Sequence, residues 1–105
     1  AEVLIGYVKI SSGMGYGGPT SVAVATDTKG EVIGVAIVDS KDTPSYFNRV
    51  LNSDFINSLR GKAYDDEFLL GKDVDAVSGA TRSSGAILES VRLGSRDIAH
   101  RHLGL

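Results

Sequence analysis

Cysteine is absent from the 105-residue sequence. Its absence excludes disulfides, zinc-thiolate sites, iron–sulfur ligation and thiol catalysis together. No apolar run approaches the roughly 18 residues that indicate a membrane span. The sequence also lacks a basic cluster, and its formal net charge is only −2. We therefore predict no nucleic-acid binding, and membrane contact only through regions outside this chain.

The chain opens on Ala1 without a basic, signal-like stretch, so we expect a mature domain or an excised fragment. Its residues are 42% hydrophobic and 23% charged, which is typical of a globular protein. The length predicts a single domain over residues 1–105. The lack of cysteine leaves the compartment open.

Local patterns predict three strands and three helices. Strands are expected over 3–10, 20–26 and 31–39. Helices are expected over 45–51, 55–59 and 83–102. A turn at Asp27-Thr28-Lys29-Gly30 makes the last two strands an antiparallel hairpin. The glycine-rich segment 11–18 is expected to be a loop, 64–72 is ambiguous, and 74–77 is either an edge strand or an extended approach. The predicted fold class is α+β, a twisted antiparallel β-sheet with packed helices.

The most informative stretch is the one just before the longest predicted helix, Asp75-Ala76-Val77-Ser78-Gly79-Ala80-Thr81-Arg82-Ser83-Ser84. The first amides of a helix lack internal partners, and the aligned peptide dipoles place about half a positive charge there. Gly79 and Ala80 leave room for a ligand beside the main chain, and four hydroxyls surround them. The stretch therefore predicts a phosphate seat. The alternatives are an ordinary helix cap at Thr81 and a turn cap at Asp75.

Other candidate motifs are weaker. Residues 13–18 contain G-x-G-x-x-G after a strand, but a dinucleotide-binding fingerprint needs these glycines to open a helix, and here Pro19 and a strand pattern follow. The segment is either a ligand-free loop or a loop that lines a ligand site. His100 and His102 are too close in sequence to share a helix face, so no metal site is expected. The sequence has no nucleophile elbow, and we assign no catalytic residue.

The motif Asp75-x-x-Ser78-Gly79-Ala80-Thr81-x-x-Ser84 resembles that of the FMN-binding domain family, in which a flavin transferase esterifies the threonine to the FMN phosphate. Two further blocks match in order. Tyr16-Gly17-Gly18-Pro19 resembles the family's Gly-Pro entry, and the block 40–47, which contains Asp42-Thr43-Pro44, resembles its Glu-Thr-Pro-Gly segment. The sequence departs from the usual family residues at Asp42, Ser45, Arg82 and Ser83.

The resemblance implies one covalent FMN per chain, attached through a phosphoester to Thr81. It also implies contacts with the cofactor from Ser78, Gly79, Ala80, Arg82, Ser83, Ser84, Tyr16, Gly17, Gly18, Asp42, Thr43, Pro44 and Tyr46. Asp75 belongs to the segment that the flavin transferase would recognise. No metal is implied.

The family includes the FMN-carrying subunits of sodium-pumping NADH:quinone reductases and Rnf complexes, and also NosR-like membrane proteins. The resemblance therefore implies an extracytoplasmic electron-transfer domain of a membrane-anchored redox assembly. Its partners would be a flavin transferase, for maturation, and redox proteins or domains. The alternatives are an FMN-bearing module of a multidomain flavin-dependent reductase and a flavin-free regulatory module of the same fold.

Overall fold

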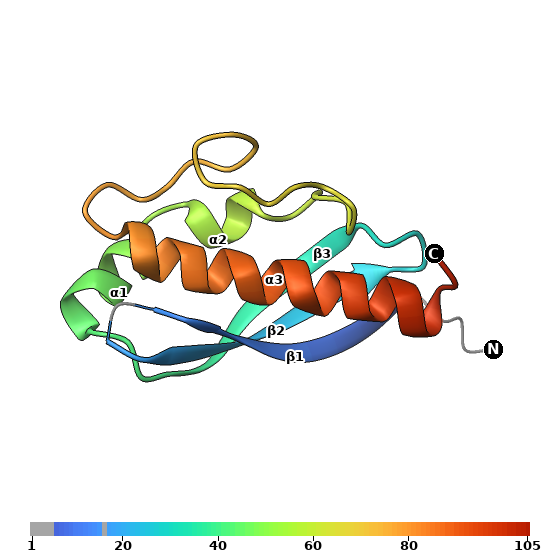
Figure 1. The fold of residues 1–105 in the computed structure, drawn as a ribbon, viewed down its shortest axis with the longest axis horizontal. Coiled ribbons are helices and arrows are strands. Elements are labelled where there is room, and N and C mark those ends of the chain that lie inside the picture. The colour runs from blue at the N-terminus through green and yellow to red at the C-terminus, as the bar shows by residue number, and fades with distance from the viewer. Residues whose placement is uncertain (1–5, 16) are drawn as a thin grey trace.

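The computed structural model describes residues 6–15 and 17–105 (Figure 1). The elements in chain order are β1 (Gly6–Met14), β2 (Pro19–Asp27), β3 (Val32–Ser40), α1 (Pro44–Leu51), α2 (Phe55–Ser58) and α3 (Thr81–His102). The strands form one sheet in the order β1-β2-β3, and both neighbouring pairs are antiparallel. The α+β prediction is confirmed. The start of the first predicted strand and Tyr16 lie outside the described residues.

Strand β1 runs further than the sequence predicted. It pairs with β2 without interruption from Gly6 opposite Asp27 to Met14 opposite Pro19. The prediction of a loop over 11–18 is therefore wrong for residues 11–14. Cross-strand pairing with the apolar strand β2 outweighs the low strand propensity of glycine. A Cβ atom on Gly13 would lie 2.2 Å from the Ala86 carbonyl oxygen, so the glycine also lets α3 approach β1.

The core lies between the sheet and α3, which crosses the sheet along its length (Figure 1). Val22 and Val24 alternate along β2 and are fully buried. The stripe predicted for the last helix is confirmed, since Ile87, Val91 and Ile98 are all buried. Two β-bulges interrupt the register of β2 with β3. None of the helices among the described residues combines the length and the apolar composition needed to cross a membrane.

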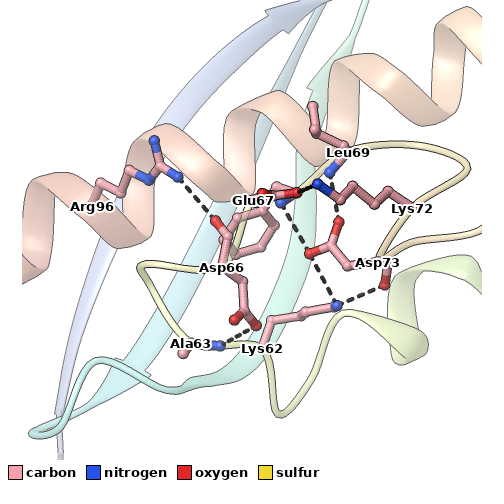
Figure 2. Close-up of polar contacts among 9 residues, drawn as sticks. Lys62, Ala63, Asp66, Glu67, Leu69, Lys72, Asp73 and Arg96 are labelled. Carbon is pink, nitrogen blue, oxygen red and sulfur yellow. Dashed lines mark hydrogen bonds and ion pairs between the residues drawn. The ribbon is translucent and has the colours of Figure 1, made fainter.

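An irregular segment connects α2 to α3, and Asp73 organises it (Figure 2). Its carboxylate accepts hydrogen bonds from the backbone amides of Leu69 at 2.7 Å and Phe68 at 3.0 Å, and from Lys62 Nζ at 3.2 Å. The Leu69 amide lowers the pKa of the Asp73 carboxyl most, with further lowering by Phe68 and Lys62. Arg96 of α3 donates to two carbonyl oxygens of the same segment and fixes it against the helix.

The last part of this segment leads to the motif. Val74 forms an isolated bridge with Leu70, and residues 75–77 then continue without strand pairing. Of the two alternatives for 74–77, the structure has the extended approach. This approach delivers the chain to the first turn of α3.

Candidate functional site

The motif forms a tight turn that leads directly into α3. The Ala80 amide donates to the Val77 carbonyl oxygen at 3.0 Å, which closes a β-turn with Gly79 as its third residue. Gly79 has a φ of +75°, a conformation that glycine adopts without steric cost. Ala80 is the N-cap residue, and Thr81 is the first residue of the helix. The threonine therefore stands in the first turn, one residue after the cap position that the ordinary-cap alternative assigns to it.

The Thr81 side chain is exposed and faces a pocket of about 280 Å³. The pocket is lined by Tyr46, Gly79, Ala80, Thr81, Arg82 and Ser83. Five of these residues come from the motif, and Tyr46 comes from α1. The acceptor hydroxyl thus lies at an accessible surface beside a cavity.

The pocket lies at the positive end of a 22-residue helix. The first turn of α3 contains no acidic residue, and the last turn contains three basic ones. The amide of Ser84 donates to the Ala80 carbonyl oxygen at 2.9 Å. The amides of Thr81 and Ser83 precede that bond, where helix geometry supplies no intrahelical acceptor. An anion at the pocket would therefore meet peptide dipoles of favourable sign.

Ser84 faces the protein interior. Its side chain is fully buried. Its hydroxyl donates to the Ala80 carbonyl oxygen at 2.8 Å and accepts from the Val77 amide at 3.2 Å. Ser84 therefore fixes the turn from inside. Ser78 and Asp75 are exposed, and neither belongs to the pocket lining.

Asp42 connects the three sequence blocks behind the pocket. It is buried, with 7% of its surface exposed. Its Oδ1 accepts hydrogen bonds from the amides of Gly17 at 2.8 Å and Thr43 at 2.7 Å. Its Oδ2 accepts from the hydroxyl of Ser83, in the first turn of α3. One carboxylate thus holds the glycine loop, the start of α1 and the start of α3 together.

The glycines of the loop allow this close packing. A Cβ atom on Gly15 would lie 2.4 Å from Asp42 Oδ2, and one on Gly17 would lie 2.4 Å from Thr43 Oγ1. Gly18 lies close to the backbone of Lys41 in the same way. In the described part of this loop, glycine therefore makes room for protein atoms, a role that the sequence pattern did not indicate.

The segment around Thr43 places α1 beside the motif. Thr43 occupies the N-cap position of α1 with an extended backbone, and Pro44 follows at the first helical position, where proline is well tolerated. From there the helix carries Tyr46 to the pocket. The three blocks predicted to act together therefore meet at one end of the molecule.

Sequence reasoning missed one residue at this site. A Cβ atom on Gly79 would lie 2.9 Å from Nη1 of Arg49, so the guanidinium of this α1 residue lies against the motif turn. Arg49 is far from the motif in sequence, and its only local signal is a basic residue in the last turn of a helix. Among the residues that the structure describes, no group of three His, Asp or Glu side chains could hold a metal ion.

Comparisons with known proteins point to the same region. The model of a family described as FMN-binding domain matches residues 15–94. The chain is 33% identical over 89 residues to the G subunit of an ion-translocating oxidoreductase complex of Stutzerimonas stutzeri, which covers 76% of this chain and 39% of that protein.

Two further relatives have similar names. The G subunit of the complex of the same name from Shewanella baltica (strain OS223) is 31% identical over 87 residues, 74% of this chain and 41% of that protein. The G subunit of a proton-translocating ferredoxin:NAD(+) oxidoreductase complex of Clostridium ljungdahlii is 29% identical over 93 residues, 84% of this chain and 50% of that protein. The chain thus spans half or less of the length of each relative.

Proposed function

This chain belongs to the FMN-binding domain family, and we propose that it is an electron-transfer domain carrying one FMN esterified to Thr81. The observation that carries the proposal is the exposed Thr81 hydroxyl at the start of α3, beside a pocket of about 280 Å³. The family resemblance noted in the sequence is confirmed by the match over residues 15–94.

The residues at the pocket fit the phosphate end of such a cofactor. Helix amides and the helix dipole favour a phosphodiester anion at this position. Gly79 and Ala80 present no bulky side chain, so a phosphate can approach the backbone. The pocket volume is at the small end of the range for ligand sites, roughly 300–1,000 Å³, and so suits the phosphate and its chain better than an enclosed ring.

FMN, when bound, supplies the ability to accept and release electrons, while the protein supplies attachment and environment. Thr81 presents the oxygen that is esterified. Ser83, held by Asp42, and Ser84, held by the turn, keep the first turn of α3 in place. We assign Tyr46 and Arg82 to direct contact with the cofactor, since both line the pocket.

The remaining predicted residues surround this centre. We propose that they either extend the cofactor contact beyond the pocket or support it from behind, as Gly17, Gly18, Asp42, Thr43, Pro44 and Ser78 would do. Tyr16 stays a prediction because it lies outside the described residues. Asp75 is exposed on the approach to the turn, a position that a flavin transferase can reach.

We propose that the domain works in a membrane-associated redox assembly on the extracytoplasmic side. Three relatives are named as G subunits of ion- or proton-translocating oxidoreductase complexes. Attachment through an ester retains the cofactor where free FMN is scarce, because a reversibly bound flavin would dissociate by mass action. Redox proteins of the assembly would be its electron donor and acceptor.

Intact-mass measurement tests the attachment. The wild-type chain, co-expressed with a flavin transferase, is expected to gain the mass of one FMN less one water. Thr81→Ala should gain nothing, whereas Ser78→Ala, which removes a neighbouring exposed hydroxyl, should gain the same mass as the wild type. A gain in Thr81→Ala would show that another residue is the acceptor. No gain in any variant would refute covalent attachment, and equilibrium dialysis would then report whether FMN binds reversibly.

A further inference from the structure

Arg49 lies at the rim of the proposed phosphate site. It is in the last turn of α1, and its side chain is exposed. Its guanidinium reaches the motif turn, where a Cβ atom on Gly79 would lie 2.9 Å from Nη1 and 3.4 Å from Cζ. Helix α1 and the start of α3 lie at the same end of the molecule (Figure 1). Two segments far apart in sequence thus place a cation against the turn that precedes Thr81.

Gly79 makes this approach possible in two ways. Its φ of +75° disfavours any residue with a side chain, and the guanidinium fills the volume that a side chain would occupy. Consecutive Cα atoms are about 3.8 Å apart, so the Cα of Thr81 lies within about 7.6 Å of that of Gly79. An esterified phosphate on Thr81 would therefore be within reach of the Arg49 side chain.

The charge of Arg49 is not balanced by a nearby acidic side chain in the part of the chain that the structure describes, where the ion pairs involve other residues. The first turn of α3 also contains no acidic residue. Phosphate oxygens match the planar donors of a guanidinium, which can bind two of them at once. The turn therefore combines an accessible cation with helix amides, on either side of the Thr81 hydroxyl.

We propose that Arg49 binds the phosphate group of the flavin nucleotide, opposite the amides of α3, and so holds the nucleotide at Thr81 before and after the ester forms. This inference rests on the proposed function and adds a residue to it. Arg49 recognises the phosphate and not the ring, so it should distinguish FMN from riboflavin, which lacks the phosphate. An arginine that only stabilises the end of α1 would not make this distinction.

The first test is an NMR titration of the ¹⁵N-labelled chain, made without a flavin transferase, with FMN and separately with riboflavin. Arg49→Gln should weaken FMN binding roughly tenfold, the effect expected for loss of one charged hydrogen-bonded contact, and should leave riboflavin binding unchanged. Arg49→Lys should fall between the two, because it keeps the charge without the planar donors. Arg60→Gln, which changes an exposed arginine beyond α2, is the matched control and should behave as the wild type.

Thermal unfolding of each apo variant checks that the fold is intact. Equal FMN affinity in wild type and Arg49→Gln would overturn the inference, as would an equal weakening of FMN and riboflavin, which indicates a structural role. Absence of FMN-induced shifts at Gly79 in the wild type would also overturn it.

The second test is the rate of mass gain with a flavin transferase at limiting concentration of the domain. Arg49→Gln is expected to react roughly tenfold more slowly than the wild type, in proportion to its weaker phosphate contact. An unchanged rate would count against the inference. If the wild type itself gains no mass, the covalent ester of the proposed function fails, and the titration still decides the role of Arg49.

Discussion

Two aspartates in this protein each collect two backbone amides and one side-chain donor, yet they organise different regions. Asp42 accepts from the amides of Gly17 and Thr43 and from the Ser83 hydroxyl. Asp73 accepts from two amides of its own loop and from the ammonium of Lys62 (Figure 2). The first is buried, whereas the side chain of the second keeps 25% of its surface exposed.

The difference lies in how far along the chain each carboxylate reaches. The partners of Asp42 are 25 and 41 residues away, apart from its neighbour Thr43. The partners of Asp73 lie within 11 residues. Asp73 therefore closes one local loop, while Asp42 assembles the candidate site from three separate segments. Loss of Asp42 should disturb both folding and attachment, and loss of Asp73 should disturb mainly folding.

The largest expected effect is that of Asp42→Ala. The substitution leaves two amides and a buried hydroxyl without their acceptor, and we expect the free energy of unfolding to fall by about 3 kcal/mol. Chemical denaturation measures this loss. Asp73→Ala is the matched comparison and should lose about 1–2 kcal/mol, because its partly exposed donors can bind water instead. Equal losses in the two variants would contradict the comparison.

The second prediction uses the pH dependence of Asp73. Its pKa is lowered in the folded state, first by the Leu69 amide, so its ionised form stabilises the fold. This contribution is fully present above the pKa of the unfolded chain, about 3.9, and is lost as the pH falls through the lower folded-state pKa. The wild type should therefore exceed Asp73→Asn in stability most at neutral pH.

Denaturant titrations at a series of pH values from 7 downward measure this difference, which should narrow steadily in acid. Asp65→Asn removes an exposed carboxyl of the same loop and is the control for the loss of one charge. A difference that stays constant down to acid pH would show that the Asp73 carboxylate does not stabilise the loop through its charge.

The same contrast explains what the sequence could and could not predict. Periodicity and turn residues are sufficient for the strands of the hairpin and for α3, because these signals are local. The Thr81 position and its neighbours also follow from a local motif. Strand β1 is longer than its local pattern predicts because its last residues pair with β2, a partner that propensity does not include.

The supporting contacts of the site are non-local, and single-sequence patterns do not contain them. The family resemblance places Asp42 near the cofactor, but its bond to Ser83 joins two segments that only the fold brings together. Arg49 has no signal beyond its place in a short helix, since its contact with Gly79 depends on how α1 packs. The glycine pattern suggests space for a ligand, whereas the described glycines make room for Asp42 and Thr43.

The smallest effects are expected when the side-chain donors are removed and the two acceptors are kept. Ser83→Ala deletes one buried hydroxyl and should lower the free energy of unfolding by about 1 kcal/mol. Lys62→Met deletes an ammonium that is 19% exposed and should cost about 0.5–1 kcal/mol. Only Ser83→Ala should slow the mass gain with a flavin transferase, by a few-fold, because Ser83 lies in the first turn of α3 beside Thr81. If Lys62→Met slowed that reaction as much as Ser83→Ala, the Asp73 loop would position the attachment site as well, and the division between a local carboxylate and an assembling one would not hold.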